Sequence, residues 1–280
     1  MEALCDLLFE ISSSERMNIM QNLLQESLKL SHVSQKLDMT VTEASRHLQR
    51  LSDVQLVHKE VDGRFSPTKY GELAIMLLSS LTFISENRQY FLQHDVSNLP
   101  YEFSNRLGEL VSSTYEIDTI RLLDRVFKIL EEADEYIWAQ SYQLSPQTIP
   151  PIQRKVENEV EFRGIYPKDI VIPLDLEHHI RFLDNIEIRI LVTDKEAMAG
   201  FKHQSEQPHY TGFFSKDSKF IKWCKDVHQY YWQQARAQRV PAACGDGVPA
   251  GLGGQEHVPR GGSGQQHPRV PEQVDQDEVH

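Results

Sequence analysis

Apolar residues recur with helical spacing in the first part of the chain, and this pattern predicts two helices there. Residues 14–25 form the first helix, with apolar side chains at Met17, Met20, Leu23 and Leu24. Ser31 is a suitable cap for a second, short helix that ends near Leu37. A short turn at Asp38 and Met39 follows, so a third element should begin directly afterwards.

A capping box predicts a third helix and two contrasting faces on it. Thr40 stands three residues before Glu43, which is the spacing of that motif. Apolar residues at helical spacing should form one buried face: Val41, Ala44, Leu48 and Leu51. The opposite face carries side-chain types that contact base edges and phosphates in protein–DNA complexes: Thr42, Ser45, Arg46, Gln49 and Arg50.

A hairpin and a long helix are predicted next. Residues 55–61 and 64–66 are expected to be strands, joined by a two-residue type I′ turn at Asp62 and Gly63. Pro67 and Thr68 open a helix whose apolar side carries Leu73, Leu77, Leu78, Leu81 and Ile84. Each feature alone is common in domains that bind no DNA, but three helices, a hairpin and a helix in this order predict a winged helix-turn-helix. Its third helix would enter a major groove, and Lys59 and Arg64 on the hairpin would contact the adjacent backbone.

The charge of this region permits DNA binding but favours two copies over one. The whole chain has a net charge of −12, which argues against coating nucleic acid by bulk charge. Residues 31–70 carry six basic and five acidic residues, a balance of +1. A monomer would therefore bind weakly, with a modest salt dependence, and we expect a homodimer. The helix over residues 72–93 is the candidate dimer surface, and packing within its own domain is an equally good explanation.

Helical and strand patterns alternate in the second part of the chain and predict an α/β domain over residues 119–239. A connector over residues 94–118 would separate it from the first domain, residues 1–93. The first helix, residues 119–134, has apolar positions at Ile120, Leu123, Phe127 and Leu130. Strands are expected over 135–140, 160–166, 187–193, 198–201 and 211–214, and an aromatic-rich helix over 216–236.

The sequence of the second domain contains none of the common catalytic motifs. It has no glycine-rich phosphate loop, no His-Glu-x-x-His zinc motif and no nucleophile elbow. No histidine precedes a lysine by two positions, so the His-x-Lys motif of phospholipase D is absent, and the adjacent His178 and His179 point in different directions. The three cysteines lie far apart, which indicates a reducing compartment and no zinc cluster. We expect that the chain is not an enzyme and that it binds no cofactor or metal. An enzyme in the α/β domain is the weakest of the alternatives.

Aromatic and cationic side chains of the second domain are candidates for a small-molecule site. The aromatics would line a pocket and the arginines would bind an anionic group. For any one aromatic residue, packing in the hydrophobic core is the more common role. The candidates are Trp138, Tyr142, Arg163, Arg189, Phe214, Trp223 and Tyr230.

Several of these motifs resemble those of a known family of regulators. The run from Leu48-x-x-Leu51 through Asp62-Gly63-Arg64-Phe65 to Thr68-x-x-Gly71 resembles the wing of ArsR-like winged-helix regulators. Metal-sensing members often carry a Cys-x-Cys pair, which this chain lacks. The segments VEFRGIYP, NIEIRILVTD and GFFSKDSKFIKWCKDVHQYYWQQAR are similar to the C-terminal part of the archaeal methanogenesis regulatory proteins.

The resemblance covers about residues 1–236 and carries several implications. It implies a cytoplasmic archaeal transcription regulator that binds a double-stranded DNA operator as a dimer. Its second domain would have a phospholipase-D-like fold without the catalytic residues and would sense a small-molecule effector. A protein-binding adaptor with a winged helix is the main alternative, since the acidic net charge permits it.

The composition changes after Arg239 and predicts a disordered tail over residues 240–280. This segment contains no Phe, Trp or Tyr, but it holds eight of the 14 glycines and five of the 13 prolines. A shifted reading frame would give the same composition. Elsewhere, the longest apolar runs are too short to span a membrane. The sequence thus predicts an α+β winged helix-turn-helix domain, an α/β domain and a disordered tail.

Overall fold

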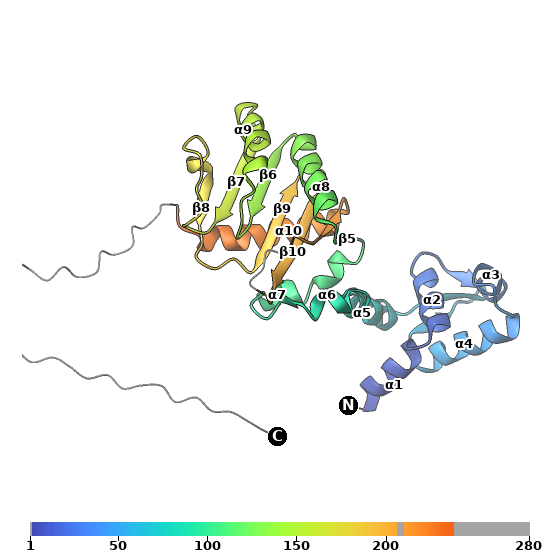
Figure 1. The fold of residues 1–280 in the computed structure, drawn as a ribbon. Coiled ribbons are helices and arrows are strands. Elements are labelled where there is room, and N and C mark those ends of the chain that lie inside the picture. The colour runs from blue at the N-terminus through green and yellow to red at the C-terminus, as the bar shows by residue number, and fades with distance from the viewer. Residues whose placement is uncertain (1, 206–209, 238–280) are drawn as a thin grey trace, which may run out of the picture. The chain divides into compact units, whose positions relative to one another are not determined.

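The computed structural model describes residues 2–205 and 210–237, which form a mixed α/β protein (Figure 1). The predicted tail, residues 240–280, lies outside the described residues. A small sheet with several helices comes first in the chain, and a larger sheet covered by helices follows. No helix in the described part of the chain is both long enough and apolar enough to cross a membrane.

The first part of the chain contains the predicted helices and hairpin, and in addition a helix α1 and a short strand β1 that were not predicted. Its helices are α1 (Glu2–Ile11), α2 (Ser14–Leu23), α3 (Leu30–Lys36) and α4 (Val41–Asp53), and its strands are β1 (Leu28–Lys29), β2 (Val57–Lys59) and β3 (Arg64–Pro67). Ser31 was expected to cap α3, but the cap residue is Lys29, which makes no side-chain cap hydrogen bond. The reason is that β1 leads directly into the helix, so Ser31 lies inside its first turn.

The hairpin between β2 and β3 has a longer connection than predicted. Lys59 lies opposite Phe65, and the Glu60 amide donates to the Arg64 carbonyl at 2.7 Å. Val61, Asp62 and Gly63 therefore form a three-residue connection, in which Gly63 adopts a left-handed φ of 84° and Asp62 does not. A turn followed by a left-handed glycine is the usual geometry of such hairpins, so the two-residue type I′ prediction was wrong.

Helix α5 (Lys69–Glu86) follows the hairpin and has an exposed apolar side. Thr68 caps it by accepting a hydrogen bond from the Gly71 amide at 3.0 Å. The predicted helix over residues 72–93 is interrupted at Asn87, and α6 (Arg88–Phe91) follows. Gly71, Ala74 and Phe83 are buried, whereas most of the predicted apolar side is exposed: Leu73, Leu77, Leu81 and Ile84.

The larger sheet has the strand order β5-β11-β10-β9-β6-β7-β8, with β4 (His94–Asp95) pairing with β10. Strands β6, β7 and β8 are parallel, and the other pairs are antiparallel. The strands are β5 (Thr114–Glu116), β6 (Tyr136–Gln140), β7 (Glu161–Tyr166), β8 (Ile180–Phe182), β9 (Ile188–Thr193), β10 (Ala197–His203) and β11 (Gly212–Ser215). The sequence therefore predicted five of these strands and missed β4, β5 and β8.

Helices cover both faces of this sheet (Figure 1). Helices α8 (Thr119–Glu132) and α9 (Ile149–Glu157) pack on one face, and α10 (Ser218–Gln234) packs on the other. On α8 the buried positions include Leu122 and Val126, while Ile120 is 72% exposed. The buried face of α8 is therefore rotated about the helix axis relative to the predicted face, because the position of the sheet decides which side chains are buried.

Residues 94–118, predicted to be a connector, contribute to the larger sheet and its core. They supply β4 and β5 to the sheet, and they include α7 (Tyr101–Ser104) and the 3-10 helix η1 (Leu107–Leu110). Phe103, Leu107 and Leu110 are buried in the same core as α10. The strands are only two and three residues long, which leaves no periodic pattern for sequence analysis to detect.

Candidate nucleic-acid interface

Helix α4 is fixed at its start by the predicted capping box. The Glu43 amide donates to Thr40 Oγ1 at 3.2 Å, and the Thr40 amide donates to Glu43 Oε2 at 2.9 Å. The hydrogen bonds that the Glu43 carboxylate accepts from the Thr40 amide and hydroxyl hold its pKa below the usual value. Ala44, Leu48 and Leu51 are buried as predicted, but Val41 is 53% exposed. The sequence therefore predicted which side of α4 is buried. It did not predict that Val41 is exposed, because this depends on how far the neighbouring elements extend along the helix.

The opposite face of α4 and the hairpin border a common groove. Thr42, Ser45, Arg46 and Gln49 are exposed. Ser45 and Gln49 line a groove of about 690 Å³, to which the hairpin contributes Lys59 and Gly63. The same two α4 residues border a second hollow along the first turns of α4, together with Thr42 and Arg46. Five of the predicted DNA-contacting residues thus lie along one continuous surface.

Arg50 is held away from this groove by an acidic residue of α1. Its Nε lies 2.9 Å from Glu10 Oε2, and its guanidinium lies 5.4 Å from the centre of the Phe9 ring. The hydrogen bond from Arg50 lowers the pKa of Glu10, whose side chain is 11% exposed and also pairs with Arg16. In this arrangement Arg50 connects α4 to α1, and it does not line the groove.

The acidic residues near the groove are engaged within the protein. Asp53 accepts a hydrogen bond from Gln49 at 2.7 Å, and Asp62 pairs with Arg64 at 3.1 Å. Neither Arg46 nor Lys59 has an ion-pair partner among residues 2–205 and 210–237. Two cations are therefore available for an anionic partner, and Arg64 is exposed in a surface pair that contributes little to stability.

Two residues that the sequence did not single out also line the groove. His58 lies on β2, where it points away from the buried Val57, and Tyr70 lies in the first turn of α5. The sequence could have indicated His58, because side chains alternate between the two faces of a strand and Val57 is apolar. Tyr70 gives no such signal, because only the packing of α5 beside the hairpin brings it to the groove.

The seven candidate ligand residues of the second domain do not form one site. Trp138, Trp223 and Tyr230 belong to the core under α10, where Arg163 stacks 4.4 Å from the Trp138 ring centre. Phe214 is buried in the core on the other face of the sheet, under α8 and α9. Arg189 lines a cavity on that second face, and Tyr142 lies beside it, with 5.6 Å between the guanidinium carbon and the ring centre.

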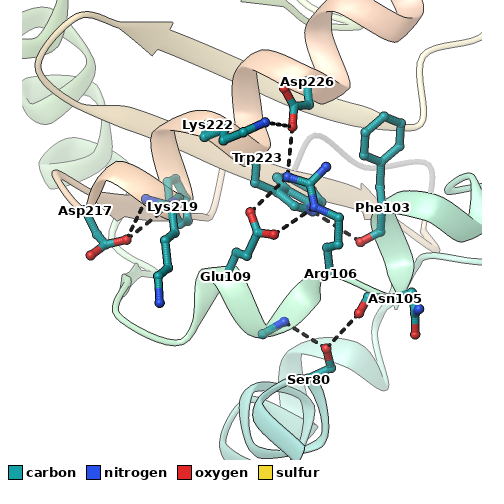
Figure 2. Close-up of polar contacts among 12 residues, drawn as sticks. Ser80, Phe103, Asn105, Arg106, Glu109, Asp217, Lys219, Lys222, Trp223 and Asp226 are labelled. Atoms are coloured by element: carbon teal, nitrogen blue, oxygen red, sulfur yellow. Dashed lines mark hydrogen bonds and ion pairs between the residues drawn. The ribbon is translucent and has the colours of Figure 1, made fainter. Parts of the chain in front are cut away.

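Helix α5 is connected to α10 by hydrogen bonds and ion pairs through η1 (Figure 2). Ser80 Oγ accepts from the Gly108 amide at 2.9 Å. Arg106 pairs with Glu109 and with Asp226 of α10, each at 2.8 Å. The Trp223 indole donates to the Phe103 carbonyl at 3.2 Å. Helix α5, which follows the hairpin, is thus linked through η1 to the hydrophobic core beneath α10.

Comparisons with known proteins show weak similarities of fold. TrmBL2, described as an archaeal chromatin protein with a novel mode of DNA binding, is 12% identical, with a TM-score of 0.39 over 81% of this chain and 94% of that one. NucT from Helicobacter pylori is 12% identical, with a TM-score of 0.38 over 45% of this chain and 98% of that one. Nuc from Salmonella typhimurium, a phospholipase D family member, is 13% identical, with a TM-score of 0.35 over 46% and 97% of the two chains.

No family model matches the chain, and no curated protein matches it. Across the described residues, no group of three or more His, Cys, Asp or Glu side chains is arranged to hold a metal ion. The assignment of function therefore depends on the groove and on the side chains that border it.

Proposed function

We propose that the chain is a sequence-specific DNA-binding transcription regulator whose first domain is a winged helix-turn-helix. The observation that carries this proposal is the groove between the exposed polar face of α4 and the hairpin, together with the adjoining hollow along α4. Lys59 borders the groove and Arg46 borders the hollow, and neither cation has an ion-pair partner within the described part of the chain. In such domains the helix enters the major groove and the hairpin lies on the adjacent backbone. Thr42, Ser45, Arg46 and Gln49 would contact bases, and Lys59 and Arg64 would contact phosphates.

Arg46→Ala is expected to relax sequence specificity, whereas Lys59→Ala is expected to weaken binding to all duplexes alike. Loss of a base contact costs about 1–3 kcal/mol for the cognate site, and loss of a phosphate contact reduces the salt dependence by about one ion. Fluorescence anisotropy at several salt concentrations, with DNA from the gene's own upstream region and a random duplex, measures both effects.

Arg50→Ala is the matched control for this experiment, because Arg50 lies on the same helix but is paired with Glu10. It should change stability more than specificity. If Arg46→Ala lowers affinity equally for both duplexes, the assignment of α4 to the major groove is wrong. If no duplex is bound in a salt-dependent way, the adaptor alternative is favoured.

We infer that the exposed side of α5 is the dimer interface. The chain carries no charged residue from Leu73 to Ser85, and Leu73, Met76, Leu77 and Leu81 are 50–62% exposed. An uncharged apolar helical face does not suit DNA, but it complements a second copy of itself around a two-fold axis. Two copies would also double the number of phosphate contacts, which the modest local charge requires.

Leu77→Glu is expected to convert a dimer into a monomer and to weaken DNA binding by about tenfold or more, because it places a charge in an apolar interface. Size-exclusion chromatography with light scattering measures the oligomeric state. Ile120→Glu is the control, since Ile120 is an exposed apolar residue of α8 outside this face. A dimer that persists in Leu77→Glu, or a wild-type protein that is monomeric at all concentrations, would rule out this interface.

The second domain is, in this proposal, a phospholipase-D-like regulatory module that senses a small molecule and performs no catalysis. The absence of the His-x-Lys motif from the sequence supports this role. The hydrogen-bonded connection from α10 through η1 to α5 provides a physical route by which a ligand would change DNA affinity. Such coupling is typically worth about 1–3 kcal/mol.

A further inference from the structure

A small cavity lies between the sheet and the helices α8 and α9. Its volume is about 100 Å³. Apolar side chains from α8, α9 and the sheet form most of its wall, including Leu122, Val126, Ile152, Leu191 and Met198. For comparison, an engineered apolar cavity of about 150 Å³ binds benzene. A ligand that fits here therefore has only a few carbon atoms.

Arg189 brings a positive charge to the wall of this apolar cavity. The residue is 5% exposed, and its Nη2 donates to the Thr211 carbonyl at 2.5 Å. Gly200 leaves room for the guanidinium, because a Cβ at that position would lie 3.0 Å from Nη2. The hydrogen bond to Thr211 and the space beside Gly200 of β10 thus fix the position of the guanidinium.

The charge of Arg189 has no acidic partner in the described part of the chain. Its Nε also lacks a hydrogen-bond partner there. The guanidinium carbon lies 5.6 Å from the Tyr142 ring centre and 5.9 Å from that of Tyr210. Stacking on tyrosine compensates only part of the cost of burying a cation, which is normally paired with an anion.

Two buried amide oxygens near this part of the sheet also have no partner among the described residues. Gln140 is fully buried, and its Nε2 donates to the Ile188 carbonyl at 3.0 Å, which leaves its Oε1 unsatisfied. Gln143 Oε1 is likewise buried and unsatisfied. Both oxygens are acceptors and cannot pair with an anion, so the unpaired guanidinium of Arg189 is the group that indicates a missing anionic ligand at this cavity.

We propose that this cavity binds a small organic carboxylate, whose anionic group pairs with Arg189 and whose short apolar tail contacts α8 and α9. A planar carboxylate suits a guanidinium, and the apolar wall excludes fully hydrated inorganic anions. This inference rests on the proposed function in that it gives the effector a chemical class. Ligand binding is nevertheless measured without DNA, so that the two proposals fail separately.

Thermal unfolding of the full chain tests the proposal, with sodium propionate and sodium butyrate as probes. Butyramide has a similar shape without the charge, and sodium chloride matches the ionic strength. Millimolar propionate or butyrate is expected to raise the unfolding midpoint by about 4 °C or more, while butyramide and chloride leave it unchanged.

Arg189→Met should abolish this shift, because it keeps the apolar stem of the side chain and removes the charge. Arg163→Met is the matched control, since Arg163 is a partly buried cation on the opposite face of the sheet. Val126→Phe fills part of the cavity and provides a second test if Arg189→Met does not fold. The proposal is overturned if neither carboxylate shifts the wild-type midpoint, if chloride shifts it equally, or if Arg189→Met or a folded Val126→Phe retains the shift.

Discussion

Replacing Gly71 by alanine is expected to destabilise the first domain by about 3 kcal/mol or more. A Cβ at this position would lie 2.1 Å from the carbonyl oxygen of Leu56 and 3.0 Å from its carbonyl carbon. These are backbone atoms, and the same carbonyl oxygen accepts a hydrogen bond from the Thr68 amide at 3.0 Å, so neither side can yield cheaply. In a helix without this contact, the same substitution would stabilise the protein by about 1 kcal/mol. A decrease in the free energy of unfolding would therefore by itself indicate the clash with Leu56.

Urea unfolding followed by circular dichroism measures this effect. Gly63→Ala is a useful comparison, because its Cβ would meet nothing within 4 Å and only its positive φ of 84° opposes the change. That strain should cost about 1 kcal/mol, clearly less than the clash at Gly71. If Gly71→Ala is as stable as the wild type, α5 does not pack this closely against Leu56, between α4 and β2.

The second domain is expected to lose about 4 kcal/mol of stability between pH 6.5 and pH 3 because of His228. This residue is fully buried in α10, between the rings of Trp138 and Trp232 at 5.3 and 5.8 Å. Burial lowers its pKa to about 3, and the positive charge of Arg163 acts in the same direction. Neither ring nitrogen has a partner of normal hydrogen-bond geometry among the described residues, although the backbone of Ala139 and Arg163 slightly favours the charged form.

The sign of this effect follows from proton uptake by the unfolded chain. Above pH 6.5 the imidazole is neutral in both states and contributes nothing to the pH dependence. Below that pH the unfolded histidine binds a proton and the folded one does not, so stability falls by about 1.4 kcal/mol per pH unit until the folded pKa is reached.

His228→Phe should remove this acid sensitivity, because phenylalanine keeps an aromatic ring between the two tryptophans and cannot be protonated. Urea midpoints measured from pH 7 to pH 4 give the slope. His32→Asn is the control, since His32 is exposed and should leave the slope unchanged. Equal slopes for His228→Phe and the wild type would show that the histidine is accessible to protons in the folded state.

Local interactions account for most of what the sequence predicted correctly. The Thr40 capping box, the Thr68 cap and the strands β6, β7 and β9 each depend on residues close together in the chain. Features that depend on distant partners were not predictable. Arg50 is paired with a residue 40 positions away, and Ile120 faces solvent because the sheet lies on the other side of α8.

The candidate sites show the same division. The α4 face was predictable, because residue type and helical spacing are local properties. The cavity beside Arg189 was not, because it draws on residues from Leu122 to Tyr210 that only the folded sheet brings together. Aromatic content alone grouped Trp138 with Phe214, although they lie on opposite faces of the sheet.

Helix α5 belongs to two hydrophobic cores, and this limits how the protein can be divided. Ala74 packs with the first core and Phe83 with the second, with no flexible linker between them. A fragment that ends at residue 93 would carry Phe83 and Tyr90 without the partners that bury them, and would tend to aggregate. Joining either half of this chain to another protein would therefore require a cut within a helix and would have to restore the packing on both sides of it.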